Sequence, residues 1–218
     1  MQTLPNGTVT FLFTDIDGSI KLAREHPKTW EALRARHHAI LQSAMDAHNG
    51  YVFQIIGDAF CVAFHTASDG LNAAIDSQRN LQLENWENAP IKVRMGIHTG
   101  EAKLQAKGDY HGYRAMSCVQ RLMSAGHGCQ VLLSLATEEL VHDELPEGVE
   151  LSDKGEWQLK DLIRPMHIYQ LVIPGLAEDF LPLRSTNVAT LPGDEATSLL
   201  DRIVRGKLVG RERELADA

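Results

Sequence analysis

The order of strand-like and helix-like runs in the first hundred residues constrains the fold most. An apolar run rich in β-branched and aromatic residues covers 8–14, and the runs "YVFQII" and "FCVAF" follow with only a Gly-Asp turn between them. Such close spacing predicts a hairpin over 51–65. Apolar residues at helical spacing predict helices over 28–47 and 67–84, and "IKVRMGIHTG" predicts a strand over 91–99. The hairpin favours a mixed, partly antiparallel sheet over a doubly wound parallel one.

This order of elements, β-α-β-β-α-β, predicts an α+β fold with a ferredoxin-like core, in which helices pack on a mixed sheet. Further on, "RAMSCVQRLMSAG" predicts a helix that ends at Gly126, and "CQVLLS" predicts a strand. A short helix over 135–142 and strands near 156–161 and 166–173 complete the domain, which we expect to span 7–173. Residues 174–207 have the composition of a linker, and 208–218, "LVGRERELADA", predict the start of a truncated downstream domain.

The overall charge limits the classes of partner. The net charge of -8 and the isoelectric point near 5.7 argue against a nucleic-acid-binding surface, which needs a basic face. A phosphate-bearing small ligand stays possible, because a local pair of Lys or Arg is enough to bind it. No apolar run approaches the roughly 20 residues that span a bilayer, and "MQTLPNGT" does not have the form of a secretion signal. Three cysteines without a CxxC pattern indicate a reducing compartment, so we expect a cytoplasmic protein with no membrane contact.

The stretch "TFLFTDIDGSIK" ends an apolar strand in carboxylates. Asp15 stands at the end of the first predicted strand, and Asp58 lies in the turn of the predicted hairpin, which the core would place beside that strand. Two carboxylates on neighbouring strand tips can hold Mg²⁺ together with phosphate oxygens of a substrate. A helix that begins after Asp15 would offer the backbone amides of Gly18 and Ser19 to those phosphates. The alternative is that Asp58 only shapes a Gly-Asp turn.

Five segments carry a family resemblance. They are "TFLFTDIDGS", "GYVFQIIGDAFCVAF", "VRMGIHTGEA", "YRAMSCVQRLMSAGHGCQVLLS" and "GEWQLKDLIRPMHIYQL". In this order they resemble the class III nucleotidyl cyclase catalytic domain over about residues 7–173. The chain is most similar to the cyclase domains that precede a STAND-type NTPase in bacterial multidomain regulators, and "LVGRERELADA" resembles the opening of such an NTPase.

The resemblance implies a head-to-tail homodimer with active sites at its interface. It implies two Mg²⁺ or Mn²⁺ ions held by Asp15, Asp58 and the backbone carbonyl of Ile16. Arg121 matches the arginine that stabilises charge on the phosphate, and Lys160 matches the lysine that holds the terminal phosphates. The implied reaction is attack by the ribose 3′-oxygen on the α-phosphorus, with release of pyrophosphate.

The positions that recognise base and ribose depart from the family pattern. Adenylate cyclases usually carry Lys, and guanylate cyclases Glu, where this chain has Gln54, which can donate and accept hydrogen bonds. The second base-reading position is usually an Asp. Asp109 is the candidate, although strict counting back from Arg121 reaches Tyr110. The family's ribose-orienting Asn is replaced by Ser117, which has a single donor.

Two hypotheses from different classes follow. The first is an active cyclase that converts ATP to cyclic AMP. The second is a nucleotide-binding regulatory module with little turnover that controls a downstream NTPase. A diguanylate cyclase is disfavoured because "GDAF" lacks the second acid of the Gly-Gly-(Asp/Glu)-Glu-Phe signature. We assign no catalytic role to His37, His38, His98 or Asp17, and expect the two adjacent histidines to be surface or partly packed residues.

Overall fold

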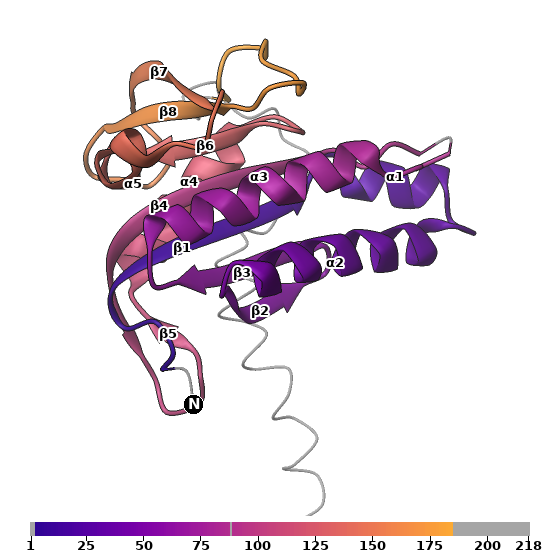
Figure 1. Cartoon of the computed structure of the whole chain (residues 1–218). Coiled ribbons are helices and arrows are strands. Elements are labelled where there is room, and N and C mark those ends of the chain that lie inside the picture. The colour runs from indigo at the N-terminus through magenta and orange to yellow at the C-terminus, as the bar shows by residue number, and fades with distance from the viewer. Residues whose placement is uncertain (1–2, 88, 185–218) are drawn as a thin grey trace, which may run out of the picture.

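The structure is a computed structural model that describes residues 3–87 and 89–184. Its elements lie in the following order (Figure 1): β1 (Gly7–Ile16), α1 (Ser19–Glu25), α2 (Trp30–Ala47), β2 (Tyr51–Ile56), β3 (Ala59–Phe64), α3 (Ala67–Leu83), β4 (Val93–Leu104), β5 (Tyr110–His111), α4 (Tyr113–Ala125), β6 (Val131–Ser134), α5 (Leu135–Val141), the 3₁₀ turn η1 (His142–Glu144), β7 (Glu150–Trp157) and β8 (Met166–Val172).

The sheet has the predicted ferredoxin-like core. Its strands run in the order β2-β3-β1-β4-β6-β8-β7, and β5 pairs with β4. β2, β3, β1 and β4 pair with one another in antiparallel fashion, whereas β4 and β6 are parallel. The sheet is therefore mixed, as predicted. The long pairing of β1 with β4 runs from Gly7↔Ala102 to Ile16↔Val93. The pairing of β1 with β3 ends at Thr14, so the pairing with β4 fixes the position of Asp15 at the tip of β1.

The sheet separates two apolar cores. Figure 1 shows α2 and α3 lying across one face, where Leu12 and Ile16 of β1 belong to one buried cluster. Phe11 and Phe13 point to the opposite face and pack in a second cluster with residues of α4, since successive strand residues alternate between faces. A Cβ on Gly96 of β4 would lie 2.6 Å from the Met123 amide nitrogen, so α4 packs on the sheet at backbone contact distance.

Some predicted boundaries were wrong. The strand predicted near 156–161 is β7, which begins at Glu150 and ends at Trp157, so residues 158–161 form a turn outside the sheet. His37 was expected at or near the surface, but its side chain is fully buried.

No helix in residues 3–87 and 89–184 combines the length and apolar character needed to cross a membrane.

The first part of the predicted linker packs on the domain. Leu183 is buried in a cluster with Leu122 of α4 and Leu132 of β6. The Gln170 side chain donates to the Glu178 carbonyl at 2.8 Å, and the Arg184 amide donates to the Ala125 carbonyl at 2.9 Å. Residues 185–207 of the predicted linker and the predicted downstream segment 208–218 lie outside the described residues.

Candidate active site

The structure brings three of the predicted metal-site residues together at the tip of β1. Asp15 and Ile16 are the last residues of that strand, and Asp58 lies in the β2–β3 turn with 8% of its surface exposed. The Ile16 amide donates to Asp58 Oδ2 at 3.0 Å, which ties the hairpin turn to the strand tip. His38 supports the same turn, because its Nε2 lies 3.0 Å from the Gly57 carbonyl oxygen.

An arginine that the sequence analysis missed accompanies this acidic pair. Arg94 stands opposite Asp15 in the β1–β4 register, and its Nε donates to Asp15 Oδ2 at 3.1 Å. Burial raises the pKa of Asp15, the Arg94 guanidinium lowers it, and the negative charge of Asp58 raises it again, with a net pKa above the usual value. The two carboxyl groups therefore repel each other in a partly buried place, and Arg94 neutralises one of them.

These residues fit a hard divalent cation. Two carboxylates that face each other are stabilised by a cation between them, and Mg²⁺ accepts few protein oxygens when water and phosphate supply the rest. No group of three or more His, Cys, Asp or Glu in the described part of the chain forms a closed metal cage. An open pair is the arrangement expected if the substrate completes the ligand set.

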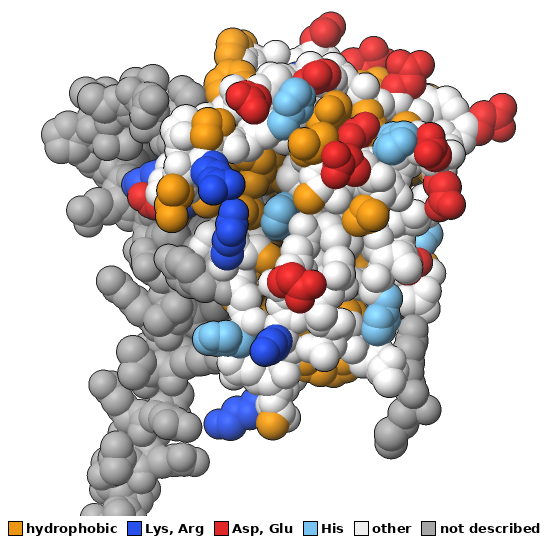
Figure 2. All heavy atoms as spheres, turned by 90° about the vertical axis from the view of Figure 1, so that its left-hand side faces the viewer, with side chains coloured by type: hydrophobic (Ala, Val, Ile, Leu, Met, Phe, Trp, Pro, Cys, Tyr) orange, Lys and Arg blue, Asp and Glu red, His pale blue; other side chains and the backbone are white. Residues whose placement is uncertain are grey.

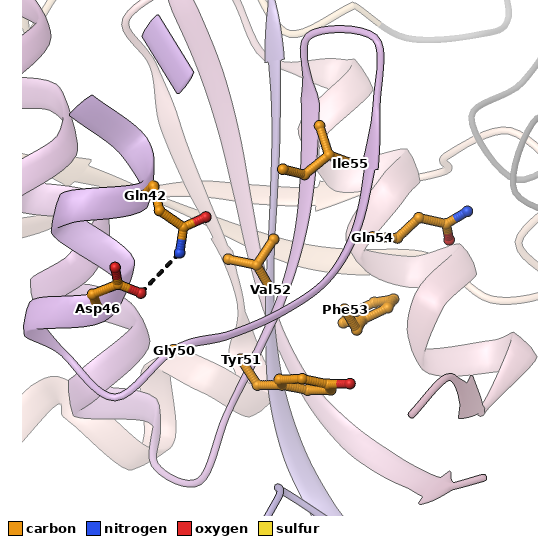
Figure 3. A pocket seen from close by; sticks show the side chains of 8 residues that line it. All are labelled: Gln42, Asp46, Gly50, Tyr51, Val52, Phe53, Gln54 and Ile55. Carbon is orange, nitrogen blue, oxygen red and sulfur yellow. Dashed lines mark hydrogen bonds between the residues drawn. The ribbon is translucent and has the colours of Figure 1, made fainter. Parts of the chain in front are cut away.

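The predicted base-reading position lies on the edge strand β2. Figure 3 shows Val52 and Ile55 pointing toward α2, whereas Tyr51, Phe53 and Gln54 point to the other side. A register shift between Val52 and Gln54 allows Phe53 and Gln54 to share that side, against the usual alternation. An open hollow of about 560 Å³ lies along β2 and the end of α2, where Gln42 donates to Asp46 at 2.8 Å.

The loop with the second predicted base-reading residue lies on the same side as Gln54. Tyr110 packs edge-on against Phe53 with ring centroids 5.1 Å apart, and Tyr51 Oη donates to the Gly108 carbonyl at 3.1 Å. Tyr110 is buried, and its hydroxyl donates to the Pro5 carbonyl at 2.7 Å. Tyr110 is therefore a core residue, and half-buried Asp109 is the better candidate for contact with a base.

The two predicted residues of α4 carry unsatisfied polar atoms. Ser117 Oγ and Arg121 Nε are buried without a hydrogen-bond partner among the described residues. They lie four residues apart, so they occupy successive turns on one side of the helix. Buried polar atoms are nearly always hydrogen-bonded in native proteins, and an exception is informative about function. A bound ligand that accepts hydrogen bonds would satisfy both atoms.

Lys160 is exposed in the turn after β7, next to the residue that holds Arg121. Arg121 forms a short ion pair with Asp161, whose φ of 59° is in the left-handed region. Arg121 therefore contacts the residue that directly follows Lys160. In the described chain Arg121 pairs with Asp161, whereas Asp15 pairs with Arg94, so the predicted phosphate-binding arginine and the acidic pair have different partners.

The turn after β1 is held by Asp17, to which the sequence analysis gave no role. Gly18 has a φ of 76° and precedes α1, which begins at Ser19, within the segment after Asp15 that was predicted to start a helix. The Asp17 side chain accepts hydrogen bonds from the Gly128 amide at 3.0 Å and from Arg184. Burial tends to raise the pKa of Asp17, but the hydrogen bonds from Arg184 and Gly128 outweigh it, and the pKa lies below its usual value.

One face of the molecule illustrates the acidic character of the chain. Figure 2 shows acidic side chains gathered over its upper part, where α5, η1 and β7 lie, while Lys and Arg form only small groups. The exposed acids of this region include Glu139, Asp143, Glu144, Glu147 and Glu150. This face offers no continuous basic surface for a nucleic-acid backbone.

Comparisons with known proteins identify the family of the domain. The family model described as the adenylate and guanylate cyclase catalytic domain matches residues 1–172. An uncharacterized protein of Mycobacterium tuberculosis is 35% identical over 198 residues, which cover 88% of this chain and 67% of that relative. A receptor-type adenylate cyclase of Trypanosoma equiperdum is 27% identical over 77% of this chain, and the match spans only 45% of that relative.

Solved structures share the fold. An adenylate cyclase of Trypanosoma brucei in its monomeric state superposes with a TM-score of 0.76 at 25% identity, over 85% of this chain and 97% of that one. The adenylyl cyclase CyaB of P. aeruginosa gives a TM-score of 0.68 at 23% identity, over 78% and 96% of the two chains. The family match over most of the chain, together with this shared fold, shows that the protein belongs to the class III adenylate and guanylate cyclase catalytic-domain family.

Proposed function

We propose that this domain converts ATP to 3′,5′-cyclic AMP and pyrophosphate. The observation that carries the proposal is the convergence of Asp15 and Asp58 at the tip of β1, tied by the hydrogen bond from the Ile16 amide. Asp15, Asp58 and the Ile16 carbonyl would hold two Mg²⁺ or Mn²⁺ ions, which when bound supply charge stabilisation at the phosphates. Structures of both adenylate and guanylate cyclases share the fold, and ATP is the substrate we propose because receptor-type adenylate cyclases are among the similar curated proteins.

The remaining groups have complementary tasks. Arg121 would stabilise the negative charge that develops on the α-phosphate, and Lys160 would hold the terminal phosphates. The Gly18 and Ser19 amides would face the phosphates as well. Ser117 Oγ would donate to the ribose, and Gln54 and Asp109 would read the base. In the proposed step the ribose 3′-hydroxyl loses its proton to solvent, its oxygen forms a bond to the α-phosphorus, and the bond from that phosphorus to the bridging oxygen breaks, so that pyrophosphate leaves.

The different partners of Arg121 and the acidic pair support a site shared between two copies. Arg121 is paired with Asp161, and the acidic pair has Arg94 as its cation, so within one copy Arg121 does not serve the acidic pair. A head-to-tail homodimer would let the Arg121 and Lys160 of one copy face the Asp15 and Asp58 of the other. A C₂ dimer formed in this way would contain two equivalent sites.

The experiment that tests this proposal is a direct assay of the 218-residue chain with Mg²⁺ or Mn²⁺. We expect cyclic AMP from ATP, and loss of product in Asp58→Ala. Arg36→Ala is the matched control, because its ion pair with Glu84 joins α2 to α3 outside the candidate site. Binding of ATP and GTP without cyclic product under both metals would refute the proposal.

That result would support the second candidate, a regulatory module that binds a nucleotide with little turnover and controls a downstream NTPase. The observations that favour it are the neutral Gln54 at the base-reading position and the short Ser117, whose Oγ has no partner among the described residues.

A further inference from the structure

The turn between β1 and α1 is held from outside the core by a distant part of the chain. Asp17 follows Ile16 directly, and its own amide donates to the Lys92 carbonyl at 2.8 Å. Its carboxylate receives the Arg184 guanidinium, with Nη1 and Nη2 at 3.1 Å from Oδ1 and Nη2 at 2.8 Å from Oδ2. The contact joins residues 167 positions apart.

An exposed ion pair alone contributes little, because two long side chains must be ordered to form it. Here the backbone that carries Arg184 is already fixed. Leu183 is buried, the Pro182 carbonyl lies 3.0 Å from His127 Nε2, and the Arg184 amide donates to Ala125. A guanidinium presented from a fixed backbone to both carboxylate oxygens loses less entropy and restrains its partner more.

The other side of Asp17 is equally confined. The Gly128 amide donates to Asp17 Oδ2 at 3.0 Å, and a Cβ on Gly128 would lie 3.1 Å from the Asp17 Cβ. The carboxylate is thus clamped between the turn after α4 and the segment after β8. Because Asp17 is two residues from Asp15 and adjacent to Ile16, this clamp restrains the backbone that carries two proposed metal ligands.

We propose that Arg184 is a positioning residue for the reaction: through Asp17 it sets the conformation of the turn that presents the metal- and phosphate-binding backbone. This inference rests on the proposed function for its catalytic meaning. In this role Arg184 acts through Asp17 and the backbone that follows Ile16. Removal of a group bonded directly to a metal ligand typically changes metal affinity by about 10–100-fold, and Arg184 is one residue further away, so we expect a change at the low end of that range.

The test uses the 218-residue chain with Arg184→Ala, Arg184→Lys and the control Arg36→Ala. Amide hydrogen exchange is measured in residues 17–22 and in β3, and Mn²⁺ affinity is measured with a non-cyclisable ATP analogue. We expect Arg184→Ala to speed exchange in the turn and to weaken Mn²⁺ binding by about tenfold, with β3 unchanged. Arg184→Lys should restore part of both, and Arg36→Ala should match the wild type.

Mn²⁺ affinity is the decisive readout, because a variant that only lowers the folded fraction reduces turnover without changing the affinity of the folded molecules. Unchanged exchange and affinity in Arg184→Ala would overturn the inference, as would equal acceleration of exchange in the turn and in β3. The wild-type turnover assay separates the two proposals. A chain that makes no cyclic product refutes the proposed function, while exchange and Mn²⁺ affinity still decide the role of Arg184.

Discussion

Asp58 has two separable roles in this structure, and a pair of substitutions can divide them. Its carboxylate is nearly buried and accepts a hydrogen bond from the Ile16 amide. It is also one of the two carboxylates that are proposed to bind the metal ions. Asp58→Ala removes both the acceptor and the charge. Asp58→Asn removes the charge but keeps a carbonyl oxygen that can accept from Ile16.

The expected losses of stability follow from the burial of that hydrogen bond. Leaving the Ile16 amide without an acceptor costs roughly 1–3 kcal/mol in unfolding free energy. For a domain of this size, each kcal/mol lowers the melting temperature by about 2–4 °C, so Asp58→Ala should melt roughly 2–12 °C below the wild type. Asp58→Asn should melt close to the wild type without metal, because it also relieves the repulsion between Asp58 and Asp15.

The assay is thermal unfolding with and without Mn²⁺, followed by turnover of ATP. Mn²⁺ that binds only the folded protein should raise the melting temperature of the wild type. Both variants should lose that increase and at least about a hundredfold of the turnover, since metal ions supply several kcal/mol of charge stabilisation. The reasoning is refuted if Asp58→Asn keeps the Mn²⁺ response, or if it is as unstable without metal as Asp58→Ala.

Further predictions concern His37, Gln54 and Ser117. Burial lowers the pKa of His37 to about 3, so the folded protein keeps this ring neutral below pH 6.5 while the unfolded chain binds a proton. His37 is therefore expected to cost about 1.4 kcal/mol of stability per pH unit as the pH falls from 6.5 toward 3. In urea unfolding, His37→Leu should remove this slope. The unfolding free energy of the variant relative to the wild type should be roughly 2 kcal/mol higher at pH 5 than at pH 8, and an unchanged pH slope would contradict the assignment. Gln54→Lys should raise ATP turnover if the side chain faces the base, and no change would place the base elsewhere. Ser117→Asn should raise kcat by about tenfold, the equivalent of one good hydrogen bond, and a kcat at or below the wild-type value would exclude Ser117 from ribose contact.

The core of the fold was predictable because its signals are local. The apolar run that ends at Asp15 and the Gly57-Asp58 turn mark their own strand boundaries, and helical spacing marks α2 and α3. The order of these elements then leaves few topologies, so the proximity of Asp15 and Asp58 could be predicted from it. The ion pair of Arg94 with Asp15 could not, because it depends on the register of two strands 79 residues apart.

Other features depend on contacts that leave little trace in the sequence. The sequence of β7 is "ELSDKGEW". It is a polar edge strand with a register shift and without a clear alternation of apolar residues. The segment 174–184, "PGLAEDFLPLR", reads as a linker because it carries two prolines and a glycine without a helix or strand period, and one buried leucine, Leu183, anchors it. His37 is adjacent to half-exposed His38, and both rings pack edge-on against Phe60, so the full burial of His37 depends on how α2 lies on the sheet.

The central claim is that the acidic pair of one copy works with Arg121 of another, and mixing two inactive variants tests it most directly. Asp58→Asn and Arg121→Ala each remove one group, and each alone should make almost no cyclic AMP. In a random mixture half of the dimers contain one chain of each kind, and each of these has one intact site. The account predicts recovery of about a quarter of the wild-type activity. A mixture that stays inactive, although wild-type chains are active and the variants exchange partners, would contradict it.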